Sequence, residues 1–130
     1  MQTCHKESIL QLMGFERFTE TGRSFKTRLS IRSNGQIGFT QGAIHRFKMQ
    51  DFKYAVLFYD KDKPAIGIRL TNDEAEEGRC KLQVRPESAT ISAKSFLDYY
   101  GINHQKTRSY GAIWDDENTM ITASLNEAIN

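Results

Sequence analysis

The chain has 130 residues, of which 38% are hydrophobic, 11% aromatic and 26% charged. This is the composition of a small globular domain, and it excludes an intrinsically disordered chain, a collagen-like repeat and a low-complexity tract. The formal net charge is only +2, so the total charge alone does not indicate a nucleic-acid-binding protein.

The predicted elements begin with a short helix in the N-terminal segment, residues 1–23. Its loose apolar face consists of Ile9, Leu10, Met13 and Phe15. Ser8 is a suitable capping residue and Gly14 a suitable stop, because serine often caps helix starts and glycine often follows helix ends. We therefore expect a helical segment in front of the main folded unit.

Residues 24–70 are predicted to form two strands, a helix and two further strands. Apolar and polar residues alternate up to Ile31, as is typical of a half-buried strand, and Asn34-Gly35 is the strongest hairpin signal in the chain. The predicted elements are strands at 25–32 and 36–39, a helix at 41–47, and strands at 54–59 and 65–70. The last two strands form a second hairpin.

The segment 71–78 is an acidic linker, and the same order of elements returns after it in residues 79–130. The predicted elements are strands at 79–85 and 89–92, a helix at 93–100, and strands at 109–114 and 120–125. Gly101 takes the position that glycine commonly occupies just after a helix. An acidic turn, residues 115–118, joins the last two strands.

The two units correspond at a constant offset of 53 residues. Residues 26–32 align with residues 79–85, so that basic or polar residues match at every second position and apolar residues match between them. The same offset aligns the helix faces, with Ala43, Ile44 and Phe47 on Phe96, Leu97 and Tyr100. The match slips between strand and helix, where Ile37 and Phe39 align with Thr90 and Ser92. We infer an internal duplication and predict an α+β fold, in which two ββαββ repeats form a pseudo-symmetric, mainly antiparallel β-barrel or sheet with short helices.

The small net charge conceals opposite regional charges. Residues 24–70 carry a net charge of +6 and residues 79–114 a net charge of +4, whereas the linker 71–78 and the tail 115–130 each carry −4. The two repeats are therefore strongly basic, and the balanced total does not count against a nucleic-acid partner. We expect the acidic segments to limit non-specific affinity for DNA.

Each repeat carries a basic stripe on the solvent-facing side of its first strand. The stripes consist of Lys26, Arg28 and Arg32 in the first repeat and of Arg79, Lys81 and Arg85 in the second. Residues two apart on a strand lie about 6 to 7 Å apart on one face, near the spacing of phosphates in nucleic acid. One such stripe is often only a solvated face that discourages edge pairing, but two at matching positions favour an anionic partner. Arg46, Lys48 and Lys53 are secondary candidates for DNA binding.

The motifs of residues 28–70 follow a recognisable order. They are Gly35-Gln36-Ile37, a short helix with Ala43, Ile44 and Arg46, its exit Phe47-Lys48-Met49, and strands from Tyr54 and Ala65. In this order the segment resembles the AbrB/SpoVT-type swapped-hairpin DNA-binding module, and the second repeat resembles it more faintly. The resemblance implies a DNA-binding transcription regulator, and some members of that family pair two such units within one chain.

The sequence departs from the AbrB-like pattern at three places. Asn34 stands where the family has lysine, Phe39-Thr40 replaces its isoleucine-proline step, and Asp51-Phe52-Lys53 replaces its proline-glycine-aspartate turn. These departures concern the DNA-binding loop more than the fold. A second resemblance is to the PC4- and Whirly-like single-stranded-DNA binders, which also place basic residues on curved antiparallel strands.

Motifs for catalysis and for metal binding are absent from the sequence. It contains no Gly-rich phosphate loop and no GxSxG, HExxH or EF-hand spacing, and its three histidines stand apart from one another. Cys4 and Cys80 form neither a disulfide framework nor a zinc-ligand cluster, and Cys80 suits a core position on a strand. We therefore expect no enzyme, no cofactor, no metal site and no small-molecule substrate.

The aromatic residues of the strands admit two interpretations. Tyr54, Phe58, Tyr110 and Trp114 alternate along predicted strands, a pattern that suits either stacking on nucleic-acid bases or burial. Most aromatic strand residues lie in the core of a protein, so we expect these four in the core or between the repeats.

The sequence thus predicts a non-enzymatic DNA-binding protein that contacts phosphates through its basic stripes. The alternative is a protein-interaction module, an accessory or inhibitor protein, that binds an acidic protein partner and has no affinity for nucleic acid. No apolar run reaches the roughly 18 to 20 residues of a membrane-spanning helix, and the N-terminal residues lack the order of a signal peptide, so we expect a cytoplasmic protein without membrane contact. Single- or double-stranded DNA, and a monomer or a homodimer, are left open.

Overall fold

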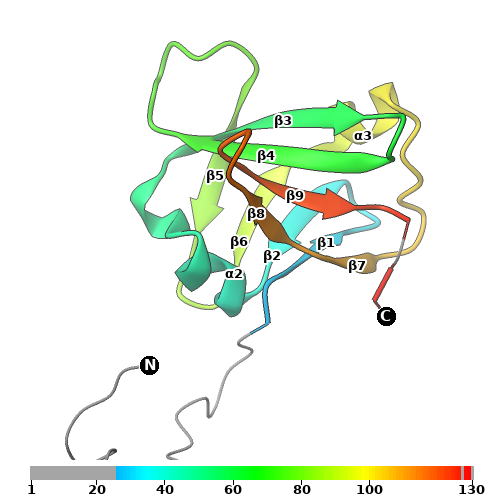
Figure 1. Cartoon of the computed structure of the whole chain (residues 1–130), viewed down its shortest axis with the longest axis horizontal. Helices are drawn as coiled ribbons and strands as arrows, with labels where there is room; N and C mark the ends of the chain where they lie inside the picture. Colours follow the sequence, from blue (N-terminus) through cyan, green and yellow to red (C-terminus); the bar gives the residue numbers. More distant parts are fainter. Residues whose placement is uncertain (1–25, 127, 130) are drawn as a thin grey trace, which may run out of the picture.

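The computed structural model describes residues 26–126, 128 and 129, and its strands form one curved antiparallel sheet (Figure 1). The helix predicted within residues 1–23 and the thiol of Cys4 lie outside the described residues. Each of the strand and helix segments predicted from residue 26 onward is present. Their boundaries differ by at most two residues, except at Ala112 and at the start of the first strand, which begins at Arg28 rather than at residue 25.

The first half of the described chain consists of two hairpins joined by a short helix. Its elements are β1 (Arg28–Ile31), β2 (Gln36–Phe39), α2 (Gln41–Arg46), the 3-10 helix η1 (Met49–Asp51), β3 (Tyr54–Asp60) and β4 (Ala65–Thr71). Helix α2 begins after Thr40, whose hydroxyl accepts a hydrogen bond from the N–H of Ala43 at 3.3 Å. This side chain satisfies one of the free N–H groups of the first turn, as expected of a helix cap.

The second half follows the same order after the linker. Its elements are β5 (Arg79–Val84), β6 (Ala89–Ser92), α3 (Lys94–Tyr99), β7 (Arg108–Gly111), β8 (Ile113–Asp115) and β9 (Met120–Ser124). The single strand predicted at 109–114 is divided at Ala112, because the chain changes partner there. Residues before Ala112 pair with β1, and residues after it pair with β9.

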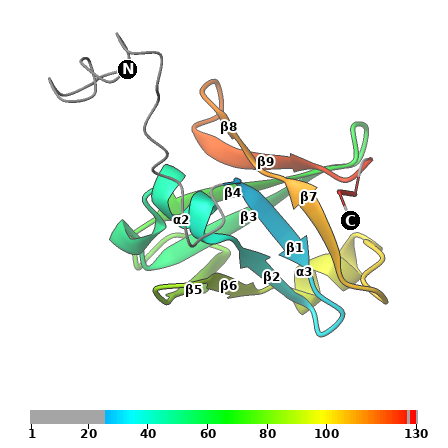
Figure 2. The same cartoon turned by 90° about the horizontal axis from the view of Figure 1, so that it is seen from below.

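The sheet curls into a nearly closed barrel, which Figure 2 shows from below. The strand order is β7-β1-β2-β6-β5-β3-β4-β9-β8, and the two outermost strands are consecutive in the chain across Ala112. The N–H of Ala112 donates to the carbonyl of Thr27 at 3.0 Å, and its side chain is buried. The bend at Ala112 therefore closes the barrel and leaves little free strand edge in the described part of the chain.

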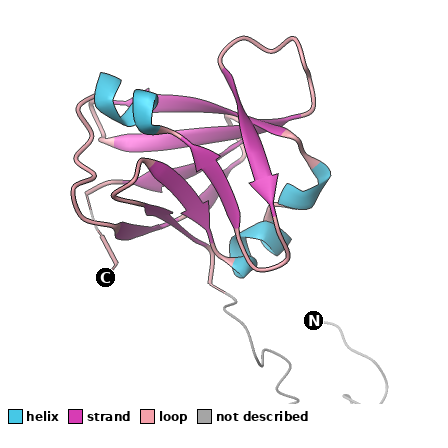
Figure 3. Ribbon diagram, turned by 180° about the vertical axis from the view of Figure 1, so that it is seen from behind, coloured by secondary structure: helices cyan, strands magenta, loops and turns pink. Residues whose placement is uncertain are grey.

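One apolar core fills the barrel. The largest fully buried side chains are Leu29, Ile31, Ile37, Met49, Ile66, Ile68, Ile91, Leu97 and Ile121. Helices α2 and α3 lie at opposite ends of the molecule, as the ribbon views from the front and from behind show (Figures 1 and 3). They contribute Ile44 and Leu97 to the core, so each helix covers one end of the barrel. Because side chains alternate between the two faces of the sheet, those on the outer face point away from this core and toward solvent.

Cys80 lies half-buried on β5, where it packs against the core. Burial raises the pKa of its thiol, because the thiolate is disfavoured away from water. In a Cys4→Ser chain we expect Cys80 to react with an aromatic disulfide reagent at least about tenfold more slowly than free cysteine near pH 8. The rate of colour release measures this, and a rate equal to that of free cysteine contradicts it.

Candidate nucleic-acid interface

The outside of four neighbouring strands carries four of the nine basic residues predicted to bind DNA. In the order β1-β2-β6-β5, alternate side chains point into the core, and those between them face outward. We name as the basic face Arg28, Ser30, Gln36, Gly38, Lys81, Gln83, Thr90 and Ser92, together with Arg32 and Arg85 at the next outward positions after β1 and β5. Arg79 also faces outward on β5, but it lies beyond this surface, where β5 pairs with β3. None of the four strands contains an aspartate or a glutamate.

Strand register arranges the basic face in rows. The central row runs from Ser30 through Gly38 and Thr90 to Gln83, since these residues are paired in turn across the four strands. Small and uncharged residues therefore form the middle of the surface, with long basic side chains on either side of it. Three strand spacings separate β1 from β5, which places their backbones about 14 Å apart.

The four corners of the basic face are cationic. On one side, the central row is flanked by Arg28 on β1 and by Arg32, the residue after β1. On the other side, it is flanked by Lys81 on β5 and by Arg85, the residue after β5. Among the ion pairs between described residues, none involves these four side chains. The nearest acidic residue along the chain is Glu87, in the turn between β5 and β6. The corners are thus available to an anion.

Arg32 is held across the face by its neighbours. Its guanidinium donates to Gln36 Oε1 at 3.3 Å, and it lies so closely over Gly38 that a Cβ at this position would clash with Arg32 Nη2. The absence of a side chain at Gly38 therefore leaves room for the Arg32 guanidinium on the basic face. A cation fixed in this way loses less side-chain entropy when it meets an anion.

The other predicted DNA-binding residues form three separate groups. Lys53 lines a shallow groove with Lys81 and so adjoins the basic face. Arg79 lies over the ring of Tyr54, at 5.4 Å from its centroid, and donates to the carbonyl of Glu76 at 3.4 Å. Lys26, Arg46 and Lys48 gather at the end of the barrel around Trp114, together with Arg28.

The sequence predicts that the four strand aromatics lie in the core or between the repeats. Tyr110 is in the core, Tyr54 is half-buried, and Trp114 contacts Phe47 of the other predicted repeat. The prediction is wrong for Phe58, and both Phe58 and Trp114 are exposed large apolar residues. Phe58 pairs with Gly67 on the outside of the barrel, where the Arg69 guanidinium lies 5.1 Å from its ring centroid. Trp114 packs against Phe47 of the α2 end, with ring centroids 6.3 Å apart, and is otherwise open to solvent.

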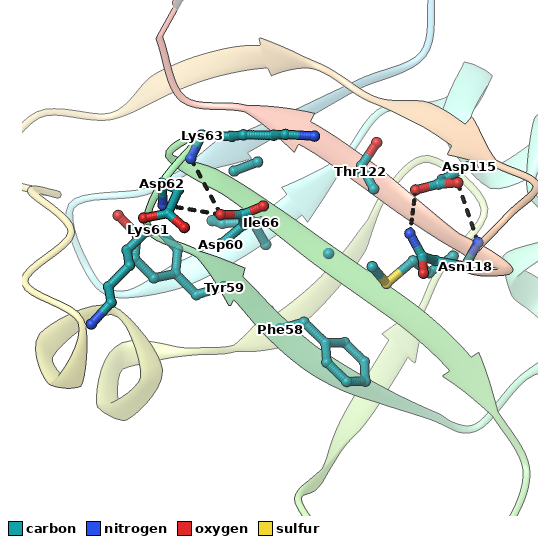
Figure 4. A pocket seen from close by; sticks show the side chains of 13 residues that line it. Phe58, Tyr59, Asp60, Lys61, Asp62, Lys63, Ile66, Asp115, Asn118 and Thr122 are labelled. Carbon is teal, nitrogen blue, oxygen red and sulfur yellow. Dashed lines mark hydrogen bonds between the residues drawn. The ribbon is translucent and has the colours of Figure 1, made fainter.

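A groove between two hairpin turns lies outside the basic face (Figure 4). Two of its carboxylates are already engaged, since Asp60 accepts from the N–H of Lys63 at 3.2 Å and Asp115 from that of Asn118 at 3.2 Å. Hydrogen bonds from the side chain and backbone of Asn118 lower the pKa of Asp115. Across the described residues, no group of three or more His, Cys, Asp or Glu side chains could hold a metal ion.

His104 joins α3 to the β1–β2 turn, a role that the sequence did not reveal. Its Nε2 lies 2.9 Å from Asp98 and its Nδ1 lies 3.4 Å from the carbonyl of Ser33. The hydrogen bond from His104, followed by that from Lys94, lowers the pKa of Asp98. These contacts connect the end of α3 to the turn that carries Arg32 into the basic face.

Comparison with known proteins adds no relative. No family model matches the chain, and no curated protein and no solved structure matches it either. Among the described residues there is no helix of the length and apolar character needed to cross a membrane.

Proposed function

We propose that this protein is a non-enzymatic DNA-binding protein that contacts phosphates through the basic face. The observation that carries the proposal is the set of four cationic corners, Arg28, Arg32, Lys81 and Arg85, around an acid-free surface of small polar residues. A surface of this kind, with few bulky side chains at its middle, lets a phosphate backbone approach closely while guanidinium and ammonium groups reach its oxygens from both sides. Such contacts release counterions, so the binding they support weakens steeply with salt.

We further propose that the barrel arose by duplication of a ββαββ unit. Supporting this, both helices end alike at an offset of 53 residues, since Phe47 N–H donates to Ala43 and Tyr100 N–H to Phe96. The residues that follow, Lys48 and Gly101, both have a positive φ, of 53° and 64°. The strand order is also symmetric when it is taken as a closed ring in which β7 and β8 together count as the counterpart of β3. Replacing each strand by its counterpart then gives the same order in reverse.

The hairpins account for the slip in the sequence alignment. Ile31 pairs with Ile37 across the first turn, whereas Val84, at the position equivalent to Ile31, pairs with Ala89. The second turn is therefore one residue shorter, which moves the apolar residues of β6 by one position relative to those of β2. On this proposal Gly38 and Thr90, which pair with each other, are equivalent residues at the centre of the basic face.

The sequence resemblance to the AbrB/SpoVT-type module favours a transcription regulator of the cytoplasm as the specific role of this DNA-binding protein. The hairpin, short helix and hairpin of residues 28–71 occur in the order of that module. The regulatory role belongs to the proposal, because contacts to phosphates position a protein on DNA without reading its sequence.

The alternative function, binding to a protein partner, is favoured by a separate observation at α3. Tyr99 is 81% exposed and stacks edge-on against Tyr100, with ring centroids 4.9 Å apart. Tyr100 in turn lies 4.8 Å from the ring of Tyr59. Exposed tyrosines of this kind often form the centre of protein interfaces. This surface lies at the opposite end of the molecule from α2 and carries no part of the basic face.

Fluorescence anisotropy with labelled DNA distinguishes the two functions. We expect the full chain to bind a random-sequence oligonucleotide, and we expect log affinity to fall with log salt at a slope of roughly −3 to −4 if four phosphates are contacted. Absence of binding at low salt, or binding that does not respond to salt, contradicts the DNA proposal. Capture of an acidic protein by a chain that does not bind DNA supports the alternative.

A further inference from the structure

A groove at the α2 end of the barrel combines an exposed indole with several cations. It is lined by Lys26, Arg28, Arg46, Phe47, Trp114 and Asp116, and we name it the tryptophan groove. Lys48 adjoins it, lining a smaller hollow with Arg46, Phe47 and Trp114. Arg28 belongs both to this groove and to the basic face, so the two surfaces are continuous.

Two contacts fix the orientation of the Trp114 indole. Trp114 Nε1 donates to Asp116 Oδ1 at 2.8 Å, and the ring leans on buried Phe47 at a tilt of 30°. Even so, 43% of Trp114 remains open to solvent, and its neighbour Ile113 is 65% exposed. Exposure of a large aromatic ring costs free energy in an isolated protein, and it is typical of a surface that meets a partner.

The charges around the ring select the partner. Four cationic side chains, Lys26, Arg28, Arg46 and Lys48, surround the indole, and Asp116 is the acidic residue among those that line the groove. A flat ring flanked by cations is complementary to a nucleotide, which combines a stacking base with an anionic phosphate. The pairing does not suit an acidic protein equally well, because acidic side chains offer no ring to stack on the indole.

The geometry points to a single-stranded nucleic acid as the partner: we propose that an unpaired base stacks on Trp114 while the adjoining phosphates reach Arg46, Lys48 and Arg28. In a duplex the faces of the bases are covered by their neighbours, so stacking on a protein side chain requires a base that is free of the helix. The proposal rests on the proposed function and gives it a substrate class.

The opposite end of the barrel supplies a comparison. It carries an aromatic pair too, Tyr59 and Tyr100, but in the aligned positions Tyr99 stands in place of Arg46 and Gly101 in place of Lys48. Both ends of the barrel therefore carry an aromatic pair. Of these two described pairs, only the pair at Trp114 is flanked by cations, Arg46 and Lys48, at the end of the neighbouring helix. Tyr99 is exposed and belongs to α3, which lies at the opposite end of the molecule from α2 (Figure 1), so it provides a matched control position.

Tryptophan fluorescence tests the proposal directly, because Trp114 is the only tryptophan of the chain. We expect saturation with an oligothymidylate of about 12 nucleotides to quench the emission strongly, and a duplex of equal length to quench it little. We expect Trp114→Ala to weaken oligothymidylate binding, followed by anisotropy of a labelled strand, about tenfold or more, and Trp114→Phe to retain most of the affinity. Duplex affinity of both variants is expected to stay within about twofold of the parent chain, as is that of Tyr99→Ala for either DNA.

The outcomes separate this proposal from the proposed function. Salt-dependent binding of DNA without quenching, with affinity unchanged in Trp114→Ala, overturns the base-stacking site and leaves phosphate binding by the basic face intact. No binding of either DNA overturns both. A Trp114→Ala chain that also loses its far-ultraviolet circular dichroism has not folded, and then Trp114→Phe and the quenching of the parent chain decide the question.

Discussion

A chain with the double substitution Arg28→Glu/Lys81→Glu is expected to bind DNA at least about a hundredfold more weakly than the parent chain at moderate salt. The two residues occupy opposite corners of the basic face, one on β1 and one on β5, with two strands between them. Under the proposed function, each substitution removes a phosphate contact and places a like charge against the DNA backbone. The slope of log affinity against log salt is expected to become shallower by about two.

The matched control for this variant is Lys61→Glu/Lys63→Glu. It changes the net charge by the same amount but at the β3–β4 turn, outside the basic face, where both lysines are exposed. Anisotropy titrations of the two variants at two salt concentrations give the comparison, with circular dichroism as the check on folding. An equal loss in both variants shows that only the total charge matters, and the basic face is then not the interface.

The sequence predicted the faces of the strands better than it predicted their neighbours. Alternation of apolar and polar residues placed Arg28 and Lys81 correctly on the outside, because a strand has a side-chain period of two. It did not predict that β2 and β6 lie side by side, with Gly38 opposite Thr90. That pairing joins residues about fifty positions apart, and many strands of similar composition compete for it, so local pattern does not select the partner.

Trp114 shows where strand alternation fails as a guide to burial. Its partner across the β8–β9 ladder is Ile121, which is fully buried, so parity alone places the indole toward the core. Strand β8 is only three residues long and begins just after the bend at Ala112, where the barrel ends and α2 provides only part of the cover. The exposure of Trp114 depends on where the barrel ends, and the alternation of residues along the strand does not predict this.

Gly35→Ala is expected to destabilise the protein by about 2 to 4 kcal/mol, the largest effect of a single methyl group that the structure indicates. Gly35 occupies the β1–β2 turn with φ of 89°, a conformation that L-residues seldom adopt. A Cβ at this position lies 2.6 Å from Lys94 Cβ and 3.0 Å from Lys94 Cα. Because the backbone of Lys94 starts α3, the clash cannot be relieved by turning a side chain alone.

Gly78→Ala separates the two causes of this effect. Gly78 has a similar φ of 80°, but nothing lies within 4 Å of the position of a Cβ there. We therefore expect it to lose only about 1 kcal/mol, the cost of the left-handed backbone by itself. Urea unfolding of both variants measures the difference. Equal losses in the two variants contradict the contact with Lys94.

The same turn also determines how the basic face is assembled. The carbonyl of Gly35 accepts from the N–H of Ala93 at 2.9 Å, and the N–H of Arg32 donates to Gln36 at 2.8 Å, so one turn fixes both the start of α3 and the path of Arg32. Gly35→Ala is therefore expected to weaken DNA binding by several-fold even where the protein remains folded, whereas Gly78→Ala leaves it unchanged. Undiminished DNA affinity in a folded but destabilised Gly35→Ala chain shows that Arg32 reaches DNA without help from this turn.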